Sequence, residues 1–124
     1  MSLLLDSNAL LWWFLDDARL TPEVVGRLKQ ERTIHISLVT PWELWIKAQA
    51  GRLELPPNFD DGISGDAFTL LSPTLEDARR AAGLPLIHRD PFDRMIIAQA
   101  LNRQATVITG DRHFAAYGVD VILV

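Results

Sequence analysis

The chain has 124 residues, of which 48% are hydrophobic and none is cysteine, and its formal net charge is −4. This length and composition suit one folded domain with a real core and exclude a disordered tail, a disulfide framework and a thiolate metal site. The negative charge excludes binding to nucleic acid by bulk electrostatics, so any such contact must be local, through a few arginines or through metal ions. We expect a single domain over residues 1–124.

Short apolar runs alternate with helical patterns along the whole chain. The apolar runs predict buried strands over residues 3–5, 33–37, 68–71, 106–109 and 119–124. The patterns between them predict helices over residues 8–16, 21–31, 41–50, 74–82 and 91–103, with Thr21, Thr40 and Asp90 as N-caps. Residues 52–65, rich in Pro, Asp and Gly, predict a loop with one short helix. This alternation predicts a parallel sheet with helices on both faces.

Neither a membrane span nor a signal peptide is expected. The longest apolar run, residues 9–15, is far too short to cross a bilayer, and the first residues, MSLLLDSN, lack a basic start. The absence of cysteine also suits a reducing compartment. We therefore expect a cytoplasmic protein that does not associate with membranes.

The stretch RDPFD, residues 89–93, places two aspartates at the start of the last predicted helix. Asp90 stands at the N-cap, Pro91 is a favoured first helical residue, and Asp93 meets the positive end of the helix dipole. Capping alone accounts for this stretch unless other acids gather at the same place.

Four acids far apart in sequence are expected at one edge of the sheet. Asp6 ends the first strand, Glu43 lies in the first turn of the helix after the second, Asp93 starts a helix that leads into the fourth, and Asp111 follows the fourth. The carboxyl ends of parallel strands share one edge, where ligand sites gather. No basic residue would neutralise these acids unless Lys47 or Arg94 folds inward.

Each acid could also serve a purely structural purpose. Asp6 could accept backbone hydrogen bonds in a turn, Glu43 could pair with Lys47 one turn along its helix, and Asp93 and Asp111 could cap helices. Jointly these structural roles are less convincing, because like charges in one cleft are costly without a cation. Carboxylate oxygens suit hard ions, so the four acids predict a Mg²⁺ or Mn²⁺ site.

Four segments in order resemble the PIN-domain family and, within it, the VapC-type toxins of toxin–antitoxin systems: LLLDSNALLWW, TPWELWIKAQAGRLELP, GLPLIHRDPFDRMIIAQA and ITGDRHFAAYGV. The resemblance runs nearly from end to end and is weakest over residues 58–67. It implies a three-layer α/β/α fold with a mainly parallel sheet of four to five strands. It also implies a Mg²⁺-dependent endoribonuclease, with Mn²⁺ as an alternative ion.

The acidic positions of the family match Asp6, Glu43, Asp93 and Asp111, which the resemblance makes the metal-binding and catalytic residues. As a hypothesis, a metal-activated water attacks an RNA phosphodiester in line. Asp6 and Asp93 would be direct ligands, whereas Glu43 and Asp111 would bind through water or orient the nucleophile. Thr109 matches a hydroxyl residue close to the acidic site in such proteins.

Basic residues border the predicted rim. The candidates for phosphate contact are Arg89, Arg94 and Arg112. It is equally consistent with the sequence that these arginines are solvated surface residues without a binding role. His35 lies inside a strand and is expected in the core or on a face of the sheet. His88 and His113 could touch substrate, but no histidine pair has the sequence spacing of metal ligands, so zinc is not expected. We assign no histidine a catalytic role.

The helical run ALLWWFL has no polar face, and Trp42 and Trp45 share one face of the helix that carries Glu43. Part of this apolar surface suits protein partners. The resemblance implies a homodimer and a groove for a VapB-type antitoxin, with RNA as substrate and DNA contacted only indirectly, through the antitoxin.

One alternative remains open: a catalytically silent PIN-like module that only binds RNA or protein. Other small α/β classes fit poorly. A receiver domain needs a lysine at the end of the fifth strand, a haloacid-dehalogenase-type phosphatase needs an acid where Asn8 stands, and a dinucleotide-binding enzyme needs glycines after the first strand.

Overall fold

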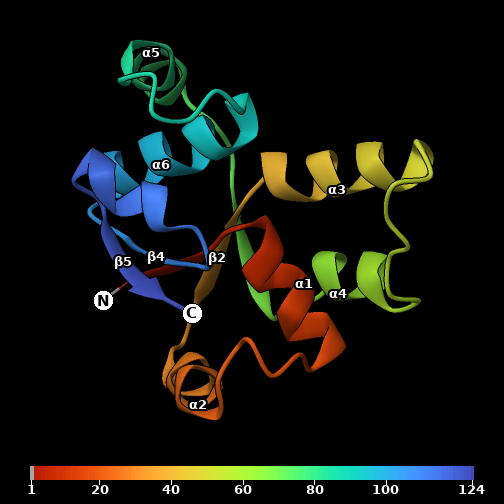
Figure 1. Ribbon diagram of the computed structural model, residues 1–124. Coiled ribbons are helices and arrows are strands. Elements are labelled where there is room, and N and C mark those ends of the chain that lie inside the picture. The colour runs from red at the N-terminus through yellow and green to blue at the C-terminus, as the bar shows by residue number, and fades with distance from the viewer. Residues whose placement is uncertain (1) are drawn as a thin grey trace.

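A computed structural model describes residues 2–124 and contains one parallel sheet (Figure 1). The strand order is β3-β2-β1-β4-β5, and every neighbouring pair runs parallel. The strands are β1 (Leu3–Leu5), β2 (Ile34–Ser37), β3 (Phe68–Leu71), β4 (Thr106–Thr109) and β5 (Asp120–Leu123). The prediction of a mainly parallel sheet is confirmed, and each predicted strand is present.

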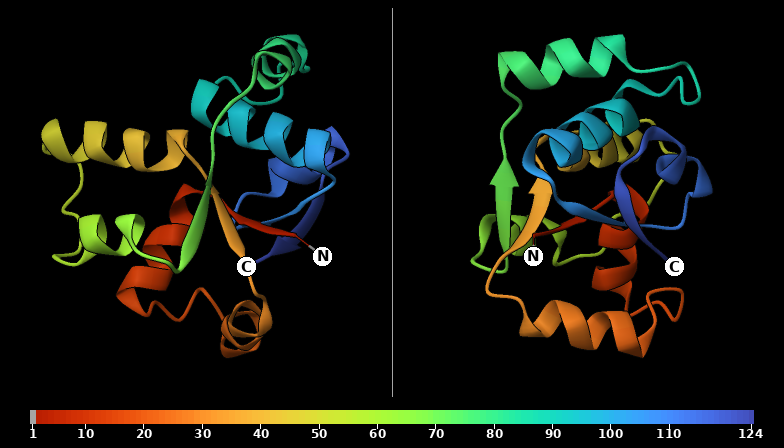
Figure 2. Two further views of the ribbon diagram at one scale, coloured as in Figure 1. Left: turned by 180° about the vertical axis from the view of Figure 1, so that it is seen from behind. Right: turned by 90° about the vertical axis from the view of Figure 1, so that its left-hand side faces the viewer.

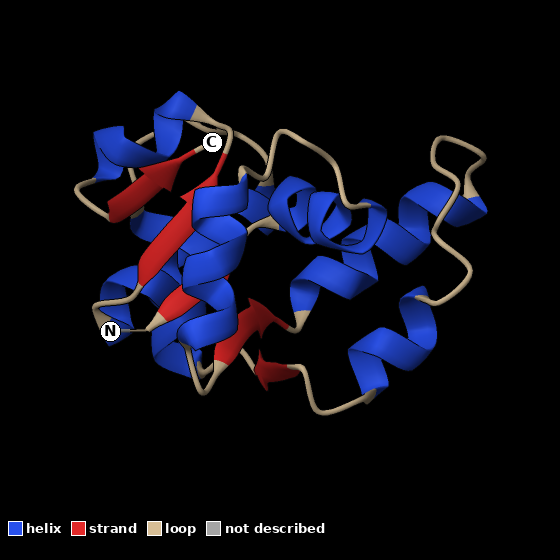
Figure 3. Ribbon diagram, turned by 90° about the horizontal axis from the view of Figure 1, so that it is seen from below, coloured by secondary structure: helices blue, strands red, loops and turns tan. Residues whose placement is uncertain are grey.

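Helices cover both faces of this sheet, as Figures 2 and 3 show. They are α1 (Ser7–Leu15), α2 (Pro22–Gln30), α3 (Val39–Gln49), α4 (Phe59–Ser64), α5 (Leu75–Gly83), α6 (Pro91–Arg103) and the 3-10 helix η1 (Arg112–Tyr117). Within the described residues 2–124, no helix is both long enough and apolar enough to cross a membrane. The predicted three-layer α/β/α architecture is confirmed.

The alternation of side chains along β1 explains the two layers of core. Leu3 and Leu5 point to one face and pack with Leu10 of α1 and Leu28 of α2. Leu4 points to the opposite face, where its core is completed by these buried residues: Ile96, Ile97 and Ala100 of α6, Val107 of β4 and Phe114 of η1. Because both faces are buried, a strand of three consecutive leucines is stable.

Helix starts follow the predicted capping residues in two cases. Thr21 caps α2 ahead of Pro22, and the Asp90 carboxylate accepts a hydrogen bond from the backbone N–H of Phe92 (2.8 Å) at the start of α6. Thr74 and Asp77 add a reciprocal capping box at the start of α5. The polar residues therefore set these helix boundaries as their chemistry predicts.

The predicted start of α3 is wrong. The helix begins at Val39, before Thr40, and the buried Thr40 hydroxyl has no partner among the described residues. Ser37 ends β2 and accepts a hydrogen bond from the backbone N–H of Val39 (3.2 Å), so the chain turns directly from strand into helix. As a consequence Glu43 lies in the second turn of α3, not in its first.

Candidate functional site

The acidic site lies where the sheet changes its direction of winding. From the central strand β1 the chain winds outward to β2 and β3, and then crosses to β4 and β5 on the other side of β1. The carboxyl ends of β1 and β4 are therefore neighbours. After β1 the chain continues toward β2 on one side of the sheet, and after β4 it continues toward β5 on the other. This is the topological switch point of an open parallel sheet, where ligand sites form.

A pocket of about 90 Å³ opens at this point and brings all four predicted acids together. Its lining consists of Asp6, Ser7, Asn8, Glu43, Lys47, Asp90, Asp93, Asp111 and Phe114. Asp6 follows β1, Asp111 follows β4, Glu43 comes from α3, and Asp93 comes from the first turn of α6. The prediction that these acids converge is confirmed.

Asp6 is buried without a basic partner among the described residues; 5% of it is exposed. Its carboxylate accepts hydrogen bonds from the Ala9 backbone N–H (2.9 Å), which caps α1, and from the Thr109 hydroxyl (2.6 Å). Burial raises the pKa of Asp6 above its ordinary value despite these two bonds, and the nearby Asp111 and Glu43 charges raise it further. Asp6 thus caps a helix and still carries a charge that lacks compensation.

Asp93 is the acid most destabilised in its charged form. Burial, followed by the charges of Asp90 and Glu43, raises the pKa of Asp93 to about 7. Its nearest basic atom is His88 Nδ1, 3.9 Å from Asp93 Oδ2. Within residues 2–124 no group donates a hydrogen bond to the Asp93 carboxylate, so its oxygens are free to bind a cation.

Glu43 is compensated, because Lys47 does fold inward. Lys47 Nζ lies 2.9 Å from Glu43 Oε2, one helical turn away, and the Ser7 hydroxyl donates to Glu43 Oε1 (2.6 Å). The pairing that offered a purely structural role for Glu43 is therefore present. This carboxylate is held in a fixed orientation at the wall of the pocket, with 3% of the residue exposed.

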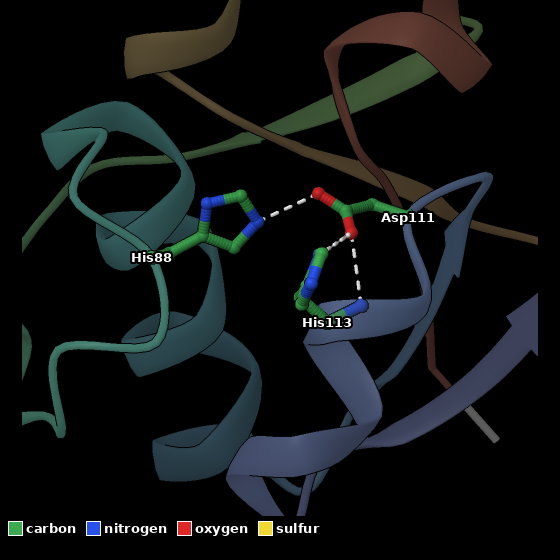
Figure 4. Close-up of side chains that lie close together, drawn as sticks. All are labelled: His88, Asp111 and His113. Atoms are coloured by element: carbon green, nitrogen blue, oxygen red, sulfur yellow. Dashed lines mark hydrogen bonds and ion pairs between the residues drawn. The ribbon is translucent and has the colours of Figure 1, made fainter.

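Asp111 is compensated by two histidines, which Figure 4 shows on either side of its carboxylate. His88 Nε2 lies 2.6 Å from Asp111 Oδ2, and His113 Nδ1 lies 3.0 Å from Asp111 Oδ1. Burial opposes the charge, but the His113 backbone N–H and the two imidazoles outweigh it and hold the pKa of Asp111 below its ordinary value. Asp111 also caps η1.

The fold brings together two histidines that are far apart in the sequence. His88 and His113 belong to different segments, yet the fold places them on the same carboxylate, and Asp111, His88 and His113 present ligand atoms that all lie within 4.8 Å of one another. Sequence spacing could not reveal this pair, because the two residues meet through the packing of the loop before α6 against η1. Spacing along the chain therefore does not exclude a histidine metal site at this pair.

Arg94, a predicted candidate for phosphate contact, serves another purpose. It is buried, and its guanidinium donates hydrogen bonds to backbone carbonyls near the end of α5 and in the loop that follows: Ala81, Ala82, Leu84, Pro85 and His88. Carbonyls at the end of a helix lack the next turn as a partner, so Arg94 supplies hydrogen bonds that the helix itself cannot. Arg89 and Arg112 are exposed and remain candidates.

The comparisons with known proteins agree with this architecture. A family model described as "PIN domain" matches residues 3–120, which include every acid of the pocket. The chain belongs to the PIN domain family. A search of curated protein sequences finds no significant match for this PIN domain.

Solved structures share the fold of this PIN domain over nearly its full length. A DNA-bound VapBC from Salmonella typhimurium is similar with a TM-score of 0.76 and 19% identity, covering 98% of this chain and 97% of that one. VapBC2 from Rickettsia felis, bound to a promoter DNA fragment, gives 0.74 and 14%, with 99% and 98% covered. A toxin–antitoxin complex from Klebsiella pneumoniae gives 0.69 and 21%, with 98% and 96% covered.

Proposed function

We propose that this PIN domain is a Mg²⁺-dependent endoribonuclease, the toxin of a VapBC-type toxin–antitoxin system acting in the cytoplasm. The observation that carries the proposal is the pocket that Asp6 and Asp93 line together, where burial and neighbouring carboxylates raise the pKa of both acids and neither carboxylate accepts a hydrogen bond from a basic side chain among the described residues. Family membership and the structural similarity to VapBC complexes support the nuclease and toxin assignments.

The residues of the pocket fit a hard divalent ion. Asp6 and Asp93 offer carboxylate oxygens, which Mg²⁺ and Mn²⁺ prefer, and their raised pKa values reflect a charge that a cation would stabilise. A volume of about 90 Å³ leaves room for an ion together with water. The compensated acids, Glu43 and Asp111, are suited to an outer role.

The four acids would then have two kinds of role at the ion. Asp6 and Asp93 would hold the ion directly, and Glu43 and Asp111 would bind it through water or orient the attacking water. When bound, the ion supplies Lewis acidity, which lowers the pKa of a bound water and offsets charge on the phosphodiester. Lys47 pairs with Glu43 and so holds its carboxylate in place at the wall of the pocket.

Arg89 and Arg112 would bind the phosphates of RNA on either side of the cleaved bond. Both side chains are exposed and flank pocket acids, Arg89 before Asp90 and Arg112 after Asp111. With a net charge of −4, the protein needs such local contacts to bring a polyanion to an acidic pocket.

Exposed apolar side chains favour protein partners, which we propose are a VapB-type antitoxin and a second copy of the chain. On α3, Trp42 is 56% exposed, Trp45 42% and Ile46 45%, and Leu15 at the end of α1 is 57% exposed. Such residues are enriched at interfaces. DNA would be contacted only through the antitoxin, in line with the DNA-bound VapBC similar in fold.

The alternative is a silent module that binds RNA or protein without cleaving it. The pocket disfavours it, because a binding module gains nothing from placing Asp6 and Asp93 in one pocket, where burial and neighbouring like charges disfavour both carboxylates. A silent module would have to keep all four acids although their like charges lower the stability of the fold.

Cleavage of RNA tests the proposal. The folded protein should cleave RNA with Mg²⁺ and not with EDTA, and Asp6→Asn or Asp93→Asn should lower the rate by at least about 100-fold, because each removes a direct ligand. Asp66→Asn, which alters an exposed acid outside the pocket, is the matched control. Folded Asp6→Asn or Asp93→Asn protein that cleaves at the wild-type rate would contradict the proposal.

A further inference from the structure

Beside the acidic pocket lies a second group of potential ligands whose chemistry differs. His88, Asp111 and His113 offer two imidazole nitrogens and a carboxylate, with all the ligand atoms within 4.8 Å of one another (Figure 4). The two imidazole rings are 5.7 Å apart between centroids and meet edge to face. The acidic pocket offers only oxygen ligands from Asp6 and Asp93, so the two groups favour different ions.

His88 is held rigidly in this position. Its backbone N–H donates to the Tyr117 hydroxyl (2.6 Å), and its carbonyl accepts from Arg94 (3.0 Å). Its ring packs edge to face against the buried Phe114, 5.6 Å between centroids. An imidazole whose backbone and ring are both fixed loses little freedom on binding a ligand, which is the preorganisation that a metal site needs.

The surroundings of His88 also match those of a metal ligand. Its Nε2 points to Asp111, while its other nitrogen, Nδ1, faces the Asp93 carboxylate at 3.9 Å. At this distance Nδ1 makes no hydrogen bond to Asp93, but a nearby negative charge favours an imidazole that binds a cation through its other nitrogen. His113 is largely exposed, with 69% of its side chain accessible, so it can turn to complete the site.

We propose that His88, Asp111 and His113 bind a divalent transition ion, with Zn²⁺ as the best-suited one, at a site that adjoins the Mg²⁺ pocket. Imidazole ligands suit zinc, copper, iron and nickel, whereas magnesium and manganese prefer oxygen, and two imidazoles with one carboxylate leave a fourth position open to water. The two sites share Asp111, which lines the acidic pocket as well. When Zn²⁺ is bound, Asp111 would therefore no longer be available to the Mg²⁺ pocket.

Binding of Co²⁺, a spectroscopic substitute for Zn²⁺, tests this site without RNA. Metal-free protein, freed of any affinity-tag histidines, is titrated with Co²⁺ in millimolar Mg²⁺ while the visible absorption of the cobalt is recorded, and Zn²⁺ is then added to displace it. We expect one saturable site. His113→Gln should weaken its affinity by about tenfold or more, as should His88→Gln.

Two further variants distinguish Co²⁺ bound at this site from Co²⁺ bound at the third histidine or in the acidic pocket. His35→Gln removes the third histidine, which lies in β2 away from the cluster, and should leave Co²⁺ binding unchanged. Asp6→Asn should abolish RNA cleavage yet leave Co²⁺ binding unchanged, so failure of the nuclease proposal and failure of this one are distinguishable. The proposal is overturned if wild-type protein shows no saturable Co²⁺ site, if folded His113→Gln binds as wild type does, or if Asp6→Asn removes the binding.

Discussion

Thr109 links the two strands that form the acidic site. It is fully buried, and its hydroxyl donates to Asp6 Oδ2 (2.6 Å) while accepting from the backbone N–H of Asp111 (2.9 Å). One oxygen therefore positions both the acid after β1 and the acid after β4. This explains why a hydroxyl residue, Thr109, stands at the end of the buried strand β4.

Replacing Thr109 tests this link. Thr109→Val keeps the shape but leaves Asp6 and the Asp111 N–H unsatisfied, so the free energy of unfolding should fall by about 1–3 kcal/mol. Thr109→Ser keeps the hydroxyl and should preserve RNA cleavage, whereas Thr109→Val should lower it. Urea denaturation and the cleavage assay measure both effects. Equal stability of wild type and Thr109→Val would show that the hydroxyl does not organise the site.

The acids were predictable from sequence because three of them are attached to regular features. Asp6 and Asp111 directly follow strands, and Asp93 sits behind the Asp-Pro start of a helix, so the parallel sheet alone brings them together. The histidines were not predictable in the same way. His88 lies in a loop without periodicity, and its contact with Asp111 depends on tertiary packing. The pairing of Lys47 with Glu43 was predicted only as an alternative to an uncompensated Glu43.

At the scale of elements, a glycine permits close contact between α4 and α1. Gly62 lies in α4, and a Cβ placed there would collide with the ring of Phe14 from α1. That ring in turn packs against Phe59 and Phe68, with centroids 5.2 and 6.0 Å away. Gly62 therefore sets how closely α4 approaches α1.

Two glycine substitutions of opposite expected effect test this contact. Gly62→Ala should destabilise the fold by about 1–3 kcal/mol, because the methyl group overpacks against Phe14. Gly26→Ala, in α2, has nothing within 4 Å of the added Cβ and should stabilise the fold by roughly 0.5–1 kcal/mol through helix propensity. Thermal unfolding compares them. A Gly62→Ala protein as stable as Gly26→Ala would contradict the packing account.

Element boundaries failed where tertiary contacts replaced local signals. The Thr40-Pro41 pair resembles a helix start, but a hydrogen bond to Ser37 begins α3 earlier. The 3-10 helix η1 has no apolar periodicity of its own, and it forms because Asp111 caps it and Phe114 is buried. The short helix expected within residues 52–65 is present as α4.

At the scale of the whole molecule, the acidic pocket couples stability to pH and to metal. The folded-state pKa of Asp93, about 7, lies above the value of about 3.9 expected for an unfolded chain. A raised carboxyl pKa contributes stability that is present below the unfolded value and is lost as pH rises toward the folded value. Metal-free protein should therefore lose this contribution between roughly pH 4 and pH 7.

Thermal unfolding of wild type and Asp93→Asn, with and without Mg²⁺, tests the central claim that Asp6 and Asp93 share a divalent ion. Above pH 7 without metal, Asp93→Asn should be the more stable protein, and its advantage should shrink toward pH 5, where Asp93 is protonated. Mg²⁺ should raise the Tm of wild type and leave that of Asp93→Asn nearly unchanged. A wild-type Tm indifferent to Mg²⁺, or an equal rise in both proteins, would contradict the account.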